Sequence, residues 1–111
     1  MNCYNIEKLF FKYNSHHTLK NITFDISAGE ILGIIGPNGS GKSTLIKLLV
    51  NVIKPESGKI KLYDRDIQKI KREELAKTVA YVPQSIDIIF PFTVFEVVLM
   101  GRSPYLKGLG F

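Results

Sequence analysis

The chain has 111 residues, enough for one small domain, and its 45% hydrophobic and 23% charged residues are an ordinary globular balance. The formal net charge is +5, but the basic residues are spread along the chain without a basic block, so we expect no nucleic-acid partner. The single cysteine, Cys3, excludes an internal disulfide and a Cys-x-x-Cys metal or redox site, and no apolar run is long enough to span a membrane.

Two strands that form a hairpin are predicted near the start of the chain. In Tyr4–Tyr13 and Thr18–Ile26, apolar side chains alternate with polar ones, which is typical of half-buried strands. The polar residues 14–17 between them predict a turn. The first strand is expected to place three side chains on one face: Leu9, Phe11 and Tyr13.

A third strand leads into a glycine-rich loop. Residues Glu30–Ile35 are a short apolar run between two glycines, which predicts a strand buried on both faces. Residues 36–43 then read G-P-N-G-S-G-K-S, the pattern G-x-x-x-x-G-K-S of a phosphate-binding loop. Its glycines let backbone N–H groups turn inward around phosphate oxygens, Lys42 supplies a cation to the β- and γ-phosphates, and the Ser43 hydroxyl can ligate Mg²⁺.

The residues after the loop predict a helix over Ser43–Ile53. This segment lacks Gly and Pro, and its apolar side chains recur at helical spacing. The start of such a helix adds its positive dipole end to a phosphate site. A chance glycine turn before a core helix is the alternative, but the order of strand, glycine loop and helix favours the phosphate site.

Four further elements complete the pattern. A breaker at residues 54–58 precedes a short strand over Lys59–Tyr63, and a short helix is expected over Ile70–Lys77. Val79–Val82 reads as a short buried strand, and Thr93-Val94-Phe95-Glu96 fits a capping box that opens a helix to about Met100. Because the early strands pair without a helix between them, we expect an α/β fold with a mixed sheet.

Three features together resemble one family of phosphate-loop proteins. Tyr13 lies in the first hairpin, the loop at residues 36–44 reads GPNGSGKST, and Gln84 follows a predicted buried strand. Over its whole length the chain resembles the ATP-binding subunit of ABC transporters. Residues 91–105, PFTVFEVVLMGRSPY, look more specifically like the importers of iron–siderophore, haem and vitamin B12 complexes. The resemblance implies a P-loop nucleoside triphosphatase fold with an N-terminal antiparallel β-subdomain.

The resemblance also implies cofactors and partners. ATP and Mg²⁺ are the expected cofactors: Tyr13 would stack on adenine rather than pack in a core, and Gln84 would join Ser43 at Mg²⁺. The helix from Thr93 would face transmembrane permease subunits at the cytoplasmic face of the membrane, and a second nucleotide-binding subunit would pair head to tail. The candidate nucleotide-binding residues are Tyr13, Gly36, Pro37, Asn38, Gly39, Ser40, Gly41, Lys42, Ser43, Thr44 and Gln84.

The sequence departs from the family in what it lacks. It contains no Leu-Ser-Gly-Gly-Gln signature, no four-apolar stretch followed by Asp-Glu, and no switch histidine after one. These motifs supply the second half of the ATP site and the catalytic base, so no catalytic residue is assigned. We therefore expect residues 1–111 to be a partial, amino-terminal nucleotide-binding domain without ATPase activity of its own.

Two alternatives come from other classes. A P-loop GTPase or small-molecule kinase shares the loop, but such proteins usually begin close to the loop strand, and the Asn-Lys-x-Asp motif for guanine is absent from the sequence. The other alternative is a non-catalytic module that binds a permease or a full-length ATPase.

Overall fold

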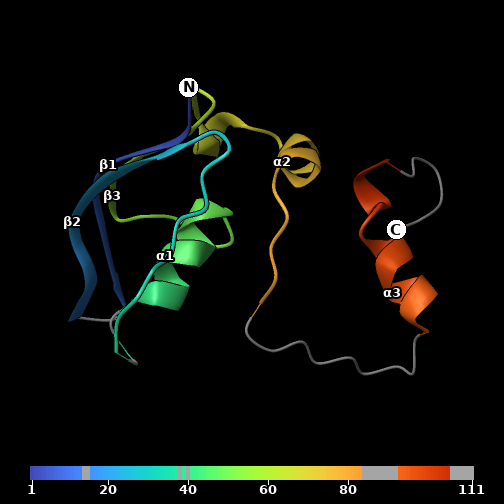
Figure 1. The fold of residues 1–111 in the computed structure, drawn as a ribbon. Coiled ribbons are helices and arrows are strands. Elements are labelled where there is room, and N and C mark those ends of the chain that lie inside the picture. The colour runs from blue at the N-terminus through green and yellow to red at the C-terminus, as the bar shows by residue number, and fades with distance from the viewer. Residues whose placement is uncertain (14–15, 38, 40, 84–92, 106–111) are drawn as a thin grey trace. The chain divides into compact units, whose positions relative to one another are not determined.

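The computed structural model describes residues 1–13, 16–37, 39, 41–83 and 93–105, and these belong to two compact units (Figure 1). The first unit is Met1–Ile70 and the second is Lys71–Phe111. Among the described residues, no helix is both long enough and apolar enough to cross a membrane.

The first unit is built on a four-stranded sheet in the order β2-β1-β3-β4, with every neighbouring pair antiparallel. The predicted hairpin is confirmed, although its second strand begins at His16, two residues earlier than expected. The predicted strand over Lys59–Tyr63 is also present, within a slightly longer strand. The strands are β1 (Asn2–Tyr13), β2 (His16–Ser27), β3 (Ser57–Leu62) and β4 (Arg65–Asp66).

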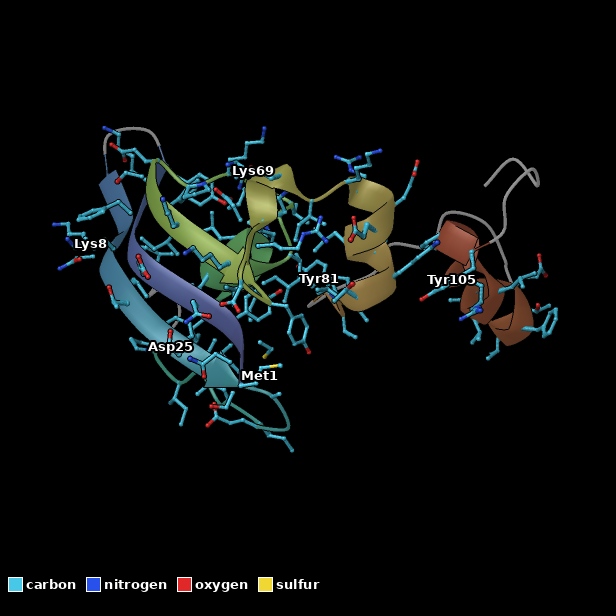
Figure 2. The ribbon with its side chains drawn as sticks, turned by 90° about the horizontal axis from the view of Figure 1, so that it is seen from above. Met1, Lys8, Asp25, Lys69, Tyr81 and Tyr105 are labelled. Atoms are coloured by element: carbon cyan, nitrogen blue, oxygen red, sulfur yellow. The ribbon has the colours of Figure 1, made fainter. Side chains whose placement is uncertain are left out.

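A bulge in β1 changes which of its side chains are buried. The pairing with β2 shifts between Ile6 and Leu9, and Lys8 between them has a left-handed φ of 48°. An extra residue in one strand lets Ile6 and Leu9 point to the same side, and both are fully buried. The Lys8 side chain itself is exposed to solvent (Figure 2). Of the three side chains expected on one face, Leu9 is fully buried, Phe11 is half-buried and Tyr13 is exposed.

The core of the first unit lies between the sheet and helix α1 (Lys42–Leu49), which runs beside one face of the sheet (Figure 1). The Tyr4 hydroxyl on β1 donates a hydrogen bond of 2.7 Å to the Leu49 carbonyl at the end of α1. The helix ends earlier than the predicted Ile53, because Asn51 takes a left-handed φ of 61° that asparagine tolerates better than most residues. The buried side chains of this core include Ile6, Leu9, Leu45, Leu48, Ile60, Leu62 and Ile67.

Two predicted strands are wrong for the described structure. Glu30–Ile35 is extended coil with Ile31 and Ile35 98% exposed, and Val79–Val82 is coil with Val82 86% exposed. Strands that are apolar on both faces need neighbouring strands and covering layers, and the described sheet includes neither segment. The described strands also pair only antiparallel, so the expected mixed sheet is not found among them.

The second unit contains two of the predicted helices. Helix α2 (Arg72–Thr78) begins two residues later and ends one residue later than predicted. Helix α3 (Val94–Met100) begins after Thr93 with both bonds of the predicted capping box. None of the residues of α3 is buried. The remaining short elements are the 3₁₀ turns η1 (Ile67–Lys69) in the first unit and η2 (Ser103–Tyr105) in the second.

Candidate phosphate-binding site

The loop enters α1 through glycines whose backbone is left-handed. Gly39 has a φ of 83° and Gly41 a φ of 99°, a region that side chains other than glycine rarely adopt. Helical bonding begins when the Leu45 N–H donates to the Gly41 carbonyl at 2.9 Å. Among the described residues no side chain caps the first turn of α1, so its backbone N–H groups can donate to an external acceptor.

Lys42 brings a positive charge to the same place. Its side chain is half-buried, and its Nζ donates to the carbonyl oxygen of Gly36 at the beginning of the loop. The ammonium group is therefore held across the loop, close to the start of α1. A cation beside free backbone donors at a helix N-terminus is the donor set that an anionic phosphate requires.

The two residues that follow Lys42 differ in their exposure to solvent. Ser43 is exposed, whereas Thr44 is buried, so of these two hydroxyl groups the one on Ser43 is open to solvent. A Cβ added at Gly39 would meet no atom within 4 Å, so this part of the loop borders open space.

These residues fit Mg²⁺ only in the company of phosphates. Mg²⁺ usually takes one or two protein ligands together with phosphate oxygens and water. Ser43 can supply one such oxygen, and within the described ranges no cluster of three or more His, Cys, Asp or Glu side chains could hold a metal alone. The donor set therefore suits a metal–nucleotide complex better than a free cation.

Tyr13 lies at the end of β1 and is not a core residue. Its side chain is 47% exposed, and its ring meets Phe11 edge to face with 4.8 Å between centroids. In the described structure the ring is therefore not enclosed in a core, and its role at adenine stays a prediction. In the view of Figure 1, the Tyr13 end of β1 and the start of α1 lie toward the same end of the first unit.

Three of the predicted site residues, Asn38, Ser40 and Gln84, lie outside the described residues. The described loop residues, 36, 37, 39 and 41–44, lead into the start of α1, and Tyr13 belongs to the same unit. Sequence reasoning missed Tyr4, which holds the opposite end of α1. Its only signal is a tyrosine on a half-buried strand, whose hydroxyl needs a partner once the ring is buried.

Comparison with known proteins identifies the family. The sequence model of the ABC transporter family matches residues 19–104, which is more than half of the chain. The chain belongs to the ABC transporter family, as its motifs predict.

Two curated relatives illustrate the similarity. The chain is 42% identical over 100 residues to the hemin import ATP-binding protein HmuV of Shewanella denitrificans, and this match covers 90% of the chain and 39% of HmuV. It is 40% identical over 103 residues to the manganese transport system ATP-binding protein MntB of Listeria monocytogenes, covering 91% of the chain and 41% of MntB. The chain spans about two fifths of the length of these relatives.

The fold agrees with solved structures of the family. A nucleotide-free ATP-binding cassette from an ABC transporter has a TM-score of 0.64 and 29% sequence identity, and the match covers 70% of this chain and 31% of the cassette. The described fold therefore resembles part of an ATP-binding cassette.

Proposed function

We propose that this protein is the ATP-binding component of an ABC importer and that it holds MgATP at the phosphate loop. One observation carries the proposal. The Lys42 ammonium group and the uncapped start of α1 occur together at a glycine-rich loop. Fixed N–H donors and a cation suit the charge of a triphosphate. Family membership argues against the GTPase and small-molecule kinase alternatives.

Each candidate residue has a role in this proposal. The loop N–H groups and Lys42 hold the phosphates, the exposed hydroxyl of Ser43 ligates the metal, and Tyr13 stacks on adenine. Ser43 would hold Mg²⁺ together with the nucleotide, and the metal would supply positive charge that offsets the charge of the phosphates. Gln84 is assigned to the metal and the attacking water by the family resemblance alone.

Residues 1–111 are proposed to be part of one nucleotide-binding domain. Its complete form would couple ATP binding and hydrolysis to transport at the cytoplasmic face of the membrane, with permease subunits and a second nucleotide-binding subunit as partners. Residues 1–111 alone are expected to show no steady ATPase turnover, because their sequence contains no signature motif and no base carboxylate of the family pattern.

The proposed cargo is an iron complex or cobalamin. Support comes from the importer-like segment at residues 91–105 and from the similarity to HmuV, whose name specifies hemin. MntB is nearly as similar to the chain and its name specifies manganese. A transport assay with a cognate permease, comparing hemin, a ferric siderophore, cobalamin and Mn²⁺, tests this part of the proposal, and uptake of Mn²⁺ alone contradicts it.

The phosphate-loop assignment predicts a large effect of Lys42→Ala on MgATP affinity. A hydrogen bond to a charged group contributes about 1.5–3 kcal/mol, so affinity should fall by roughly tenfold to more than a hundredfold. Lys47→Ala is the matched control, because it removes the same charge from the last turn of the same helix. Equilibrium dialysis with labelled ATP measures both. Equal affinities for the two variants would sink the assignment and would favour the module that binds a permease without nucleotide.

Stacking by Tyr13 predicts a different pattern. Tyr13→Ala should weaken ATP binding, since base–aromatic stacking contributes about 1–3 kcal/mol in nucleic-acid sites, whereas Tyr13→Phe should retain affinity. Tyr63→Ala removes an equally exposed tyrosine from a turn and serves as control. If Tyr13→Ala and Tyr63→Ala bind ATP as the wild type does, Tyr13 has no part in the site.

A further inference from the structure

In the second unit, one aromatic ring joins α2 to the segment that follows α3. The Tyr105 hydroxyl donates a hydrogen bond of 3.2 Å to the carbonyl oxygen of Lys77, which lies 28 residues earlier in the chain. The Arg102 guanidinium carbon lies 4.0 Å from the centre of the Tyr105 ring, and Lys77 Nζ lies 5.2 Å from it. We call Tyr105, Arg102 and Lys77 the Tyr105 cluster; Tyr105 is labelled in Figure 2.

The position of the cluster at the end of α2 explains why it forms. Lys77 lies in the last turn of α2, where the final carbonyl groups of a helix have no intrahelical partner. The Tyr105 hydroxyl satisfies one of them. The negative end of the helix dipole also favours nearby cations, and both cations lie within the distance at which an aromatic ring attracts them. Three weak interactions therefore act on one side chain.

Packing of α3 itself offers little to hold it. No residue of α3 is buried, and Val94 and Phe95 expose 82% and 74% of their side chains. The capping box stabilises the start of the helix, but it acts within the helix and fixes no direction relative to α2. The direction of residues 93–105, the α3 arm, must depend on contacts outside α3.

We propose that Tyr105 is a positioning residue that, with Arg102 and Lys77, holds the α3 arm to the end of α2 and thereby sets the direction in which the exposed apolar side chains of α3 are presented. The functional consequence rests on the proposed function, in which α3 meets a permease. The attachment itself does not, because it concerns contacts within the second unit only.

Hydrogen exchange in the full chain tests the attachment. With Tyr105→Leu, amide exchange in peptides covering residues 93–105 should rise roughly fivefold or more at short labelling times, and with Tyr105→Phe only about twofold, because the ring and its cations remain. Arg102→Gln should fall between them. Tyr63→Leu, at a similarly exposed tyrosine of the first unit, is the control and should change nothing there. Unchanged exchange in the α3 arm of Tyr105→Leu overturns the proposal.

A spectroscopic readout separates attachment from general stability. The chain has no tryptophan, so Tyr105→Trp introduces a single indole at the cluster. Its fluorescence anisotropy should be high and should fall when Arg102→Gln is added, whereas Tyr63→Trp should not respond to Arg102→Gln. If the anisotropy of Tyr105→Trp is the same with and without Arg102→Gln, the proposal is also overturned.

The same preparations distinguish this inference from the proposed function. Tyr105→Leu should bind MgATP within about twofold of the wild type, because the phosphate loop belongs to the first unit. Failure of the wild-type chain to bind MgATP would contradict the proposed function, while the exchange and anisotropy comparisons would still decide the role of Tyr105.

Discussion

Tyr4 ties strand β1 to the end of α1 that is farthest from the phosphate loop. Its hydroxyl donates to the Leu49 carbonyl at 2.7 Å, one of the terminal carbonyl groups that the helix leaves unpaired. Burial, with a smaller contribution from Cys3, raises the pKa of Tyr4 to about 12. The neutral phenol is thus the form that the fold requires, and its hydrogen bond fixes the C-terminal end of α1 to β1.

Tyr4→Phe should lower the free energy of unfolding at neutral pH by about 0.5–1.5 kcal/mol, the net contribution of one hydrogen bond. The folded pKa of about 12 lies above the unfolded value of 10, so this stabilisation is complete below pH 10 and is lost as pH rises toward 12. Urea unfolding followed by circular dichroism from pH 7 to 12 measures the difference between wild type and variant. A difference that stays constant or grows above pH 10 contradicts this account.

The backbones of the paired strands β1 and β3 come into close contact where β1 bulges. Gly58 in β3 has a φ of 97°, and a Cβ added there would come within 2.7 Å of Leu9 Cα and closer still to the Lys8 carbonyl oxygen. The breaker that the sequence predicts around Pro55 therefore has a second role at Gly58, which lets the two strands pair across the bulge. This contact joins the hairpin to the strand that follows α1.

Gly58→Ala should destabilise the first unit by more than backbone strain alone. Gly29→Ala is the matched control, because Gly29 also has a positive φ, of 80°, but its Cβ would meet nothing within 4 Å. Strain of a left-handed residue costs about 1–2 kcal/mol, so Gly29→Ala should lose that amount and Gly58→Ala clearly more. Thermal unfolding measures both, and equal losses would show that β1 and β3 have room for a methyl group.

At the scale of the whole molecule, the described residues expose much apolar surface. Ile31 and Ile35 precede the phosphate loop and are almost fully exposed, and Val82, Val94 and Phe95 are exposed in the second unit. Exposed apolar surface and extended backbone without neighbouring strands both promote association. A small domain has a stability of about 5–15 kcal/mol, so apolar side chains left exposed to water withhold a large fraction of the stabilisation that their burial could give.

The chain on its own should therefore self-associate, and Ile31→Ser with Ile35→Ser should shift it toward monomer in sedimentation velocity. Because neither side chain is in the core, unfolding of the monomer should change little. Leu48→Ala is the contrasting variant: Leu48 is fully buried, so it should cost about 2–5 kcal/mol without reducing association. A sharply unfolding wild-type monomer at high concentration would contradict the expectation.

Features that depend on neighbouring residues were determined by the sequence alone. The G-x-x-x-x-G-K-S loop, α2 and the capping box at Thr93 each depend on residues within a few positions of one another, and the family follows from the same motifs. The hairpin follows from two alternating segments that are adjacent along the chain. Tertiary structure decided the rest. Glu30–Ile35 has strand composition but remains coil, because a strand forms only when a neighbouring backbone accepts its hydrogen bonds. The Tyr4–Leu49 and Tyr105–Lys77 bonds join residues 45 and 28 positions apart, and only the folded chain brings such groups within hydrogen-bonding distance.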